Sequence, residues 1–409
     1  MAESLRIESL GAKGDGVAAV AGGPVYVPFT LPGELVEIDG AKASKARPSA
    51  ILEPSAERRE PPCPHFGACG GCDLQHASDA FYRAWKRQIV VDAFARRGIQ
   101  PPIGDLVACP PASRRRAVFS AVREGGQVRF GFFEVASHRL TDLDVCLVVM
   151  PEIAARLPDF KALAGMVLDR RRPLRMAVTA TPSGLDIALA DATKLSEKSR
   201  QAVVAFSLKR DFARVSIDDE VVVEARKPLI EIGGIALAPP PGAFLQAVAA
   251  AEEAMADQVL DHFGEAKEVA DLFAGVGTFA LRLARHARVM AVESDAPALA
   301  ALDRAVRGVP GLKPMTLERR DLFRRPLTAK ELSRFDGVVF DPPRAGAEAQ
   351  ARELARSTVR SVVAVSCNPA TLARDAHLLI EAGYRLRSVT PIDQFLWSHH
   401  VEAVAAFAR

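Results

Sequence analysis

The sequence lacks the features that mark membrane and secreted proteins. No apolar run in its 409 residues approaches the roughly 18 that a membrane span needs. The N-terminus, MAESLRIESL, has no basic region followed by an apolar stretch, so it does not fit a secretory signal. Six cysteines at uneven spacing are too few for a disulfide scaffold. We therefore expect a cytoplasmic protein with reduced cysteines and no membrane contact.

The chain also has little excess charge, internal repetition or low-complexity sequence. Its net charge of +3 does not by itself indicate nucleic-acid binding. Arginines do cluster locally, at 58–59, 114–116 and 170–172. Such clusters often lie on a solvated surface, but a few well-placed ones can neutralise several phosphates. The length suggests two or three domains.

Residues 1–56 form the first predicted unit. Short apolar pieces alternate with Gly- and Pro-rich turns, and they read LRIESL, GVAAV, VYVPF and ELVEI. This spacing predicts a small β-barrel of the oligonucleotide-binding kind, although a purely structural barrel has the same pattern.

Two further units follow, at 57–238 and 239–409. The second unit begins with a cysteine cluster and a helix from Ser78 to Arg97, which Ser78 caps and Gly98 ends, and it continues with mixed strands and helices. In the third, PPPG opens a long helix predicted over 244–263, and short apolar strands then alternate with helical segments. The fold class is therefore α/β, with a doubly wound parallel sheet at the C-terminus.

A glycine-rich loop follows the first strand of this sheet, in the sequence DLFAGVGTF. Gly275 and Gly277 allow a sharp turn and close approach of a ligand, and Glu293 at the end of the next strand can accept hydrogen bonds from ribose hydroxyls. The loop also fits a loose dinucleotide pattern, which leaves an NAD-dependent oxidoreductase open. Phe273 in the D-x-F form and Asp321 before a turn favour S-adenosylmethionine.

Two later strands end in residues suited to chemistry. One ends in Asp341-Pro342-Pro343, where two prolines stiffen the loop that carries the carboxylate. The next ends in Ser366-Cys367-Asn368, so Cys367 shares an edge of the sheet with the cofactor loop. A lone cysteine is usually structural, but this position predicts a nucleophile, and a helix from about residue 370 would favour a thiolate.

A thiolate beside S-adenosylmethionine suits methylation of carbon 5 of uracil. Its addition to carbon 6 makes carbon 5 electron-rich enough to attack the methyl group. A general base must then remove the proton from carbon 5 before the cysteine can leave. Glu402, at the start of the last strand, is the predicted base, and a surface carboxylate is the alternative.

The cysteines at 63, 69 and 72 form a C-x5-C-x2-C run. Three thiolates this close in a cytosolic protein predict a metal centre, and both an iron–sulfur cluster and zinc accept four thiolates. The spacing leaves the fourth ligand open among Cys109, Cys146 and Cys367. His65 and His76 could serve zinc instead.

Taken together, CPHFGACGGCDLQH, DLFAGVGTF, DPPRAG, SCNPATLARD and HVE resemble the RNA 5-methyluridine methyltransferases over essentially the whole chain. The resemblance is strongest to the bacterial 23S ribosomal RNA (uracil-5-)-methyltransferases that carry an iron–sulfur cluster. It implies an N-terminal TRAM domain, a central iron–sulfur domain and a C-terminal S-adenosylmethionine-dependent methyltransferase domain, in a monomer that binds ribosomal RNA.

The resemblance also implies roles for single residues. Cys367 would be the nucleophile, Glu402 the base and Asp341 a further residue at the target base. A [4Fe-4S] cluster would be held by Cys63, Cys69, Cys72 and Cys146. The residues implied at S-adenosylmethionine or the target base are Gln246, Phe273, Gly275, Thr278, Glu293, Asp321 and Asp341.

The chain departs from the family pattern at two places. Val248 stands where the motif F-x-Q-x-N has asparagine, and QFLWSHHVE replaces the commoner wording before the last strand. Three other functions stay open: methylation of uridine in transfer RNA, NAD-dependent oxidation, and an inert iron–sulfur module that only binds RNA.

Overall fold

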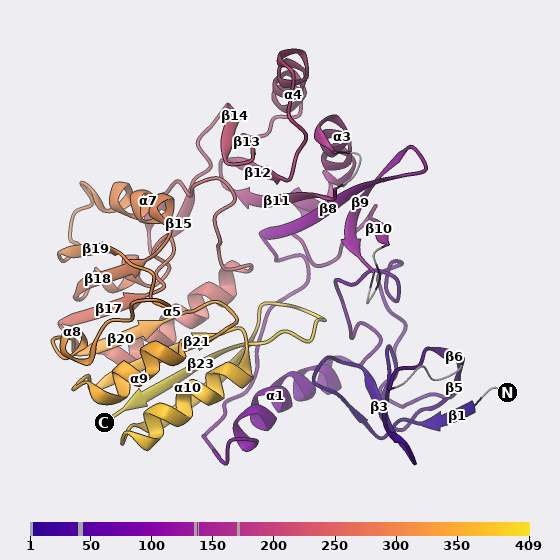
Figure 1. Cartoon of the computed structure of the whole chain (residues 1–409), viewed down its shortest axis with the longest axis horizontal. Helices are drawn as coiled ribbons and strands as arrows, with labels where there is room; N and C mark the ends of the chain where they lie inside the picture. The colour runs from indigo at the N-terminus through magenta and orange to yellow at the C-terminus, as the bar shows by residue number, and fades with distance from the viewer. Residues whose placement is uncertain (1–2, 40–43, 135–136, 138, 170–171) are drawn as a thin grey trace.

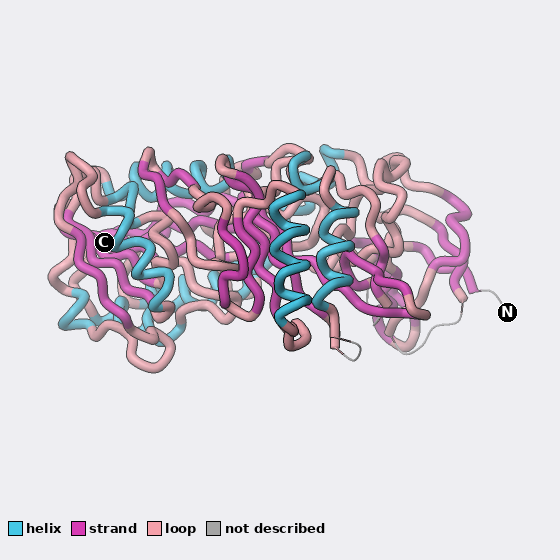
Figure 2. The backbone as a smooth tube through the Cα atoms, turned by 90° about the horizontal axis from the view of Figure 1, so that it is seen from above, coloured by secondary structure: helices cyan, strands magenta, loops and turns pink. Residues whose placement is uncertain are grey.

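The computed structural model describes residues 3–39, 44–134, 137, 139–169 and 172–409, so Arg170 and Arg171 of the third arginine cluster lie outside the described residues. The chain is arranged in three parts (Figure 1). Seen from above, they form an elongated slab with the N-terminal strands at one end and the C-terminal sheet at the other (Figure 2). Among the described residues, none of the helices is long and apolar enough to cross a membrane.

The N-terminal part is a small β structure, as the turn-rich sequence predicts. Two three-stranded sheets, ordered β1-β5-β6 and β2-β3-β4, enclose a core that includes Val27, Val36 and Ile38. The strands are β1 (Glu3–Arg6), β2 (Ser9–Leu10), β3 (Gly16–Val20), β4 (Gly23–Val27), β5 (Leu35–Ile38) and β6 (Pro48–Glu53). The sequence analysis did not single out β6.

The cysteine segment leads into helix α1 (Asp79–Ala95), which confirms the helix predicted from the cap at Ser78. The Ser78 side chain accepts a hydrogen bond from the Phe81 N–H at 3.3 Å. Val90 and Phe94 are buried in the hydrophobic core beneath the C-terminal sheet. Strand β7 (Val107–Ala108) joins the edge of that sheet beside β22 (Arg385–Asp393). The segment 79–108 was predicted to belong to the second unit, but it packs against the C-terminal sheet of the third unit.

The central part is a seven-stranded sheet ordered β10-β9-β8-β11-β12-β13-β14 with helices on one side. A row of stacked phenylalanines, including Phe119, Phe130 and Phe160, fills its core. A separate pair of strands, β15 and β16, follows it. The elements are β8 (Arg116–Glu124), β9 (Gln127–Phe133), β10 (Leu140–Asp142), α2 (Pro151–Ala154), α3 (Leu157–Val167), β11 (Leu174–Thr181), β12 (Gly184–Ala190), α4 (Glu197–Lys209), β13 (Arg214–Ile217), β14 (Glu220–Glu224), β15 (Ile230–Ile232) and β16 (Ile235–Leu237).

The C-terminal part is an eight-stranded sheet ordered β19-β18-β17-β20-β21-β23-β22-β7. Helices α5, α6 and α7 cover one face, and α1, α8, α9 and α10 cover the other. The elements are α5 (Ala249–Phe263), β17 (Glu268–Leu272), α6 (Ala280–Leu283), β18 (Arg288–Glu293), α7 (Ala296–Val306), β19 (Met315–Arg319), α8 (Ala329–Leu332), β20 (Gly337–Phe340), α9 (Glu348–Arg356), β21 (Ser361–Ser366), α10 (Pro369–Glu381) and β23 (Glu402–Ala408). The central strands are parallel, as predicted. The chain adds β18 and β19 on one side of β17 and then returns to add β20 and β21 on the other side, so the order of the strands switches between β17 and β20. Open sheets bind ligands at such a switch point.

The helix predicted over 244–263 starts later than its sequence indicates. Helix α5 begins at Ala249, because the backbone just before it pairs with another segment. The Ala247 carbonyl accepts the Arg115 N–H at 2.8 Å, and Val248 forms a bridge with Arg114. This pairing keeps 244–248 extended, beside the carboxyl ends of the strands.

The first two arginine clusters lie at joints between the three parts. Arg58 forms an ion pair with the fully buried Glu34, and Arg115 forms one with the buried Glu252 at 2.5 Å. Arg116 donates to the Ala243 carbonyl at 3.0 Å. These arginines therefore hold the parts together, and their pairing fits neither the solvated surface nor the free phosphate-binding cluster considered from the sequence.

Candidate active site

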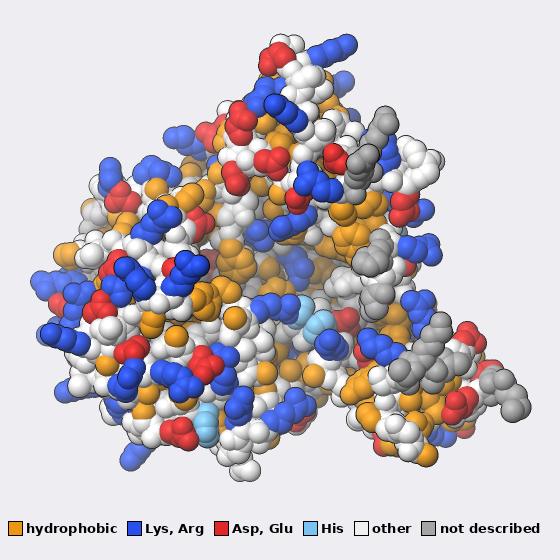
Figure 3. All heavy atoms as spheres, in the orientation of Figure 1, with side chains coloured by type: hydrophobic (Ala, Val, Ile, Leu, Met, Phe, Trp, Pro, Cys, Tyr) orange, Lys and Arg blue, Asp and Glu red, His pale blue; other side chains and the backbone are white. Residues whose placement is uncertain are grey.

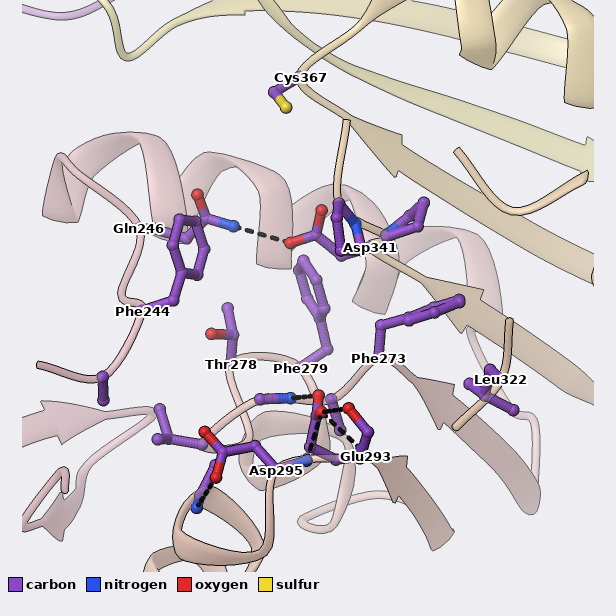
Figure 4. A pocket seen from close by; sticks show the side chains of 18 of the residues that line it. Phe244, Gln246, Phe273, Thr278, Phe279, Glu293, Asp295, Leu322, Asp341 and Cys367 are labelled. Carbon is purple, nitrogen blue, oxygen red and sulfur yellow. Dashed lines mark hydrogen bonds between the residues drawn. The ribbon is translucent and has the colours of Figure 1, made fainter. Parts of the chain in front are cut away.

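A cavity of about 490 Å³ opens at the carboxyl ends of β17, β18, β20 and β21 (Figure 4). It lies at the switch point of the sheet, where the parallel strands bring their end loops together. The residues of the predicted cofactor and catalytic sets all line this one cavity: Gln246, Phe273, Gly275, Thr278, Glu293, Asp321, Asp341, Cys367 and Glu402. Residues more than 150 positions apart in the sequence thus meet at one place.

The glycine loop is held in shape by two carboxylates. Asp271 is buried, and its Oδ2 accepts the Ala280 N–H at the start of α6 at 2.8 Å. Glu293 accepts the Gly275 N–H at 3.0 Å, so its carboxylate is fixed at the cavity floor. Gly277 has a φ of 101°, and a Cβ there would lie 2.6 Å from Leu302, so only glycine fits. The conformation of the loop beside Glu293 is therefore fixed by these contacts.

Two aromatic rings form the far wall of the cavity. Phe273, whose φ of 61° is unusual for a bulky residue, lies 5.4 Å from Phe323 between ring centroids. Phe323 remains half exposed. Asp321 accepts the Phe323 N–H at 3.0 Å and so orients this ring. Exposed aromatic faces beside a fixed carboxylate suit a ligand that combines a flat ring with hydroxyl groups. The sequence analysis missed Phe323, although it directly follows the predicted Asp321 turn.

A chain of hydrogen bonds joins two buried carboxyl groups on the opposite wall. The Gln246 side chain donates to Asp341 at 2.8 Å (Figure 4). Gln394 donates to Gln246 at 2.9 Å and to Glu402 at 2.6 Å. The Ala247 N–H donates to the Gln394 side-chain oxygen at 3.0 Å, which fixes the orientation of that amide. Gln394 was not predicted from the sequence, because it directly follows a strand, β22, that was not predicted either.

Burial raises the pKa values of both carboxyl groups at the ends of this chain. Asp341 is raised by its removal from water, and its hydrogen bond from Gln246 opposes the effect. Glu402 is raised first by burial and then by the negative charge of Asp341. Two neighbouring carboxyl groups with raised pKa values retain protons near neutral pH, and the negative charge of one opposes ionisation of the other. A carboxylate with a raised pKa is a stronger base, which suits removal of a proton from carbon.

Cys367 lies between β21 and α10, beside these carboxyl groups. Burial of the sulfur, followed by the charges of Glu402 and Asp341, raises the pKa of Cys367 to about 11, and Arg344 opposes this. The sequence analysis expects the helix start to favour a thiolate. That effect is outweighed, because burial and two acidic neighbours act on the sulfur more strongly than a helix end does.

A second cavity, of about 460 Å³, meets the first at Cys367 and Arg344, which line both. Its other walls come from the N-terminal strands around Gly11, from α1 and from the loop at 399–401. The thiol therefore stands where two cavities meet, and only the first contains the predicted cofactor residues. Lys and Arg side chains surround the hollow onto which the three parts face (Figure 3).

The cysteines of the predicted cluster line a third, small cavity of about 60 Å³. Cys63, Cys69, Cys72 and Cys146 all lie in its wall, whereas Cys109 is buried elsewhere, in the core under α5. Burial raises the pKa of Cys69 to about 11 and that of Cys72 to about 12, and the neighbouring cysteines add to both shifts. Within the described ranges, no three His, Cys, Asp or Glu side chains are placed to hold a single metal ion.

The two histidines considered as zinc ligands do not line this cavity. His65 pairs with Asp144 at 2.6 Å, and His76 is buried against the ring of Phe66 at 5.3 Å between centroids. The donor set at the cavity is therefore made of thiols.

Comparisons with known proteins agree with this arrangement. A family model described as tRNA (uracil-5-)-methyltransferase matches residues 312–409. An uncharacterised RNA methyltransferase of Brucella suis is 55% identical over 99% of this chain and 97% of its own length. The 23S rRNA (uracil(1939)-C(5))-methyltransferase RlmD of Shewanella amazonensis is 32% identical over 99% of this chain and 95% of its own.

The fold also matches a solved structure along its whole length. The tRNA (uracil-54, C5)-methyltransferase of Pyrococcus abyssi, solved in complex with S-adenosyl-L-homocysteine, aligns with a TM-score of 0.76 at 21% identity. The alignment covers 99% of both chains. At this identity the match shows the fold, and it includes the N-terminal β part as well as the C-terminal sheet.

Proposed function

Because the chain belongs to the RNA 5-methyluridine methyltransferases, which take their methyl group from S-adenosylmethionine, we propose that it methylates carbon 5 of one uridine in 23S ribosomal RNA through a covalent adduct with Cys367. The observation that carries the proposal is the place of Cys367 at the meeting of two cavities. S-adenosylmethionine would occupy the first, and the RNA would approach through the second. Membership of this family excludes an NAD-dependent oxidoreductase, the alternative that the glycine-rich loop left open.

The residues of the first cavity have distinct parts in binding the methyl donor. Glu293 would accept hydrogen bonds from the ribose hydroxyls, and Phe273 and Phe323 would flank the adenine beside Asp321. Gly275 and Thr278 belong to the loop that passes close to the ligand. The methyl group would then point toward Asp341, Glu402 and Cys367, on the opposite wall.

The reaction begins when the Cys367 thiol gives its proton to water and the resulting thiolate adds to carbon 6 of the uracil. The electrons of the C5–C6 double bond move toward the O4 carbonyl and give an enolate. Carbon 5 then attacks the methyl group, and the bond from methyl to sulfur breaks to leave S-adenosylhomocysteine. The Glu402 carboxylate takes the proton from carbon 5, the double bond forms again, and the sulfur leaves carbon 6.

Asp341 and Gln246 would hold the target uracil in place during these steps. Gln246 bridges Asp341 and Gln394, and Gln394 in turn donates to Glu402, so the four side chains form one hydrogen-bonded chain. An amide and a protonated carboxyl group can both bind the polar edge of uracil. The raised pKa of Asp341 keeps a proton available for this contact.

Two observations favour ribosomal RNA over transfer RNA. RlmD is 32% identical along the whole chain, against 21% for the transfer RNA enzyme of Pyrococcus abyssi. The cysteine motif resembles that of the ribosomal RNA enzymes. The N-terminal β part, which lines the second cavity at Gly11, would bind RNA as a TRAM-like domain spanning residues 1–56.

The substrate is tested with RNA from a strain in which the gene is deleted. The purified enzyme and S-adenosylmethionine with a labelled methyl group should label the 23S RNA of that strain and leave its transfer RNA unlabelled. Mapping should place the label in 5-methyluridine at one position. Labelling of transfer RNA alone would show that the transfer RNA alternative is correct, and no labelling of either RNA would contradict the proposal.

The four cysteines of the small cavity suit a [4Fe-4S] cluster. Four thiols without a histidine or carboxylate in the wall are the donor set of such a cluster. When bound, the cluster would cross-link the segment 63–72 to Cys146 in the central part, a structural role.

The cluster predicts a metal content that can be measured. Protein prepared without oxygen should contain about four irons and four acid-labile sulfides per chain. Cys146→Ala should lose most of both, whereas the matched variant Cys109→Ala, which removes a buried thiol outside the cavity, should keep them. One zinc per chain in place of iron would contradict the assignment.

A further inference from the structure

The loop between β22 and β23 begins with Gln394 and leads directly into Glu402, the first residue of β23. Its conformation is not one that its own sequence prefers. Trp397, in the middle, has a φ of 60°, the left-handed region that a bulky side chain rarely adopts. Such a backbone persists only where surrounding contacts hold it. The contacts that hold this loop therefore also decide where Gln394 and Glu402 lie.

One fully buried lysine makes most of these contacts. Lys86, from α1, pairs with the Asp393 carboxylate at 2.8 Å. Its ammonium group also donates to three backbone carbonyls of the loop, those of Ser398 at 2.9 Å, Phe395 at 3.3 Å and His400. A buried charge is unfavourable unless it is paired and hydrogen-bonded. Here the loop wraps around the ammonium group, which replaces water for the carbonyls.

Two residues near Lys86 hold the centre of the same loop. The Tyr82 hydroxyl donates to Asp393 at 2.7 Å and accepts the Trp397 N–H at 2.7 Å. Asp73, directly after Cys72, donates its N–H to the Trp397 carbonyl at 2.7 Å, and its carboxylate accepts the His399 N–H at 2.8 Å. The strained residue is thus bound on both its N–H and its carbonyl.

Apolar packing adds a further constraint. Leu396 is buried in a small cluster with Leu31 of the N-terminal part, Leu74 of the cysteine segment, and Tyr82 and Trp85 of α1. The N-terminal part, the cysteine segment and α1 therefore all meet at this loop. The contacts come from residues that are more than 300 positions away from it in the sequence.

We propose that Lys86 is a positioning residue for the step that resolves the covalent adduct, because it holds the loop 393–402 in the conformation that places Gln394 against Glu402. Tyr82 and Asp73 support the same conformation. This inference rests on the proposed role of Glu402. It differs from a general stabilising role in one respect: loss of Lys86 should slow proton removal at carbon 5 more than it weakens the binding of S-adenosylmethionine.

Lys86→Met in the full-length protein tests this inference, with Arg214→Met as the matched control. Arg214 is also a buried cation, and it pairs with Asp186 at 2.7 Å in the central sheet, away from the loop. Both variants should lose stability, because each leaves a buried carboxylate without its partner. Turnover of 23S RNA by the folded fraction should fall roughly tenfold to a hundredfold in Lys86→Met and stay unchanged in Arg214→Met.

The sharper readout is the methylated adduct itself. In Lys86→Met, a covalent enzyme–RNA species should accumulate on denaturing gels while the dissociation constant for S-adenosylmethionine stays at the wild-type value. Equal turnover and no adduct in the folded Lys86→Met protein would overturn the inference. Absence of activity and adduct in the wild-type enzyme would instead overturn the proposed function.

Tyr82→Phe decides the question if Lys86→Met does not fold. It removes one hydroxyl without leaving a cavity, and so frees the Trp397 N–H and one Asp393 oxygen. Release of product should slow several-fold, with methyl transfer to the RNA less affected. Release at the wild-type rate in a folded Tyr82→Phe protein would show that these contacts do not hold the loop in the conformation needed for the reaction.

Discussion

Cys367→Ala is expected to abolish formation of 5-methyluridine while leaving the affinity for S-adenosylmethionine unchanged. Carbon 5 of uracil is too poor a nucleophile to attack the methyl group unless a thiolate has first added to carbon 6. Removal of a covalent nucleophile lowers turnover by about a thousandfold or more. The residues proposed to bind the ribose and the adenine lie on the loops after β17, β18 and β19, so they do not depend on the sulfur.

The measurement combines methyl transfer to 23S RNA with calorimetric binding of S-adenosylmethionine. Cys109→Ala is the matched control, because it also removes a buried thiol but lines neither of the two cavities at Cys367. It should remain active. Turnover of Cys367→Ala within about tenfold of the wild type would show that the reaction does not pass through a covalent adduct at this residue.

The high pKa of Cys367 has a consequence for the order of events. At about 11, it leaves the sulfur protonated near neutral pH. The two nearby carboxyl groups contribute to the shift, so they repel the thiolate least when they themselves carry protons. The raised pKa values of Asp341 and Glu402 favour that state before the reaction. Glu402 must then lose its proton before it can act as the base, which couples the two halves of the reaction.

The residues of the main cavity could be predicted from the sequence for a physical reason. Several of them end or directly follow a short apolar strand, and the carboxyl ends of parallel strands meet at one edge of the sheet. The strand EVADLF, the strand RVMAVE and the strand DGVVF therefore bring Phe273, Glu293 and Asp341 together without knowledge of the loops. The same argument places Cys367. Their chemical roles come from the resemblance rather than from geometry.

What the sequence does not reveal depends on contacts between distant segments. Strand β22 carries polar residues and Pro391, so its pattern does not indicate a strand, and Gln394 at its end is missed with it. Lys86 occupies a helix position that would normally be solvated, yet it is fully buried. Only the return of the chain at 393–400 covers it. Helix α5 is shortened for the same reason, since residues 114–115 pair with the backbone before it.

Glu402→Gln is expected to trap the methylated RNA on the enzyme. The amide keeps the shape of the carboxylate, and its oxygen can still accept the hydrogen bond that Gln394 donates at 2.6 Å. It cannot take the proton from carbon 5, so the double bond cannot form again and Cys367 stays attached to carbon 6. Loss of a general base lowers turnover by about a hundredfold to ten-thousandfold.

The trapped species should survive denaturation and contain protein, RNA and one added methyl group by mass spectrometry. Combining Glu402→Gln with Cys367→Ala should remove it, which identifies the sulfur as the point of attachment. Normal turnover by Glu402→Gln would show that Glu402 is not the base.

The same experiment distinguishes Glu402 from Asp341, the other carboxyl group of the pair, as the general base. Asp341 lies in the same cavity wall, and its pKa is also raised by burial, so on its surroundings alone it could remove the proton. If Asp341 were the base, Asp341→Asn would accumulate the adduct and Glu402→Gln would not. With Glu402 as the base, Asp341→Asn should slow formation of the adduct, because its amide can still accept the Gln246 hydrogen bond but replaces the carboxyl group that is proposed to contact uracil. The variant that traps the methylated adduct therefore identifies which carboxylate takes the proton, because a residue needed only for binding cannot stop the reaction after the methyl group has been transferred.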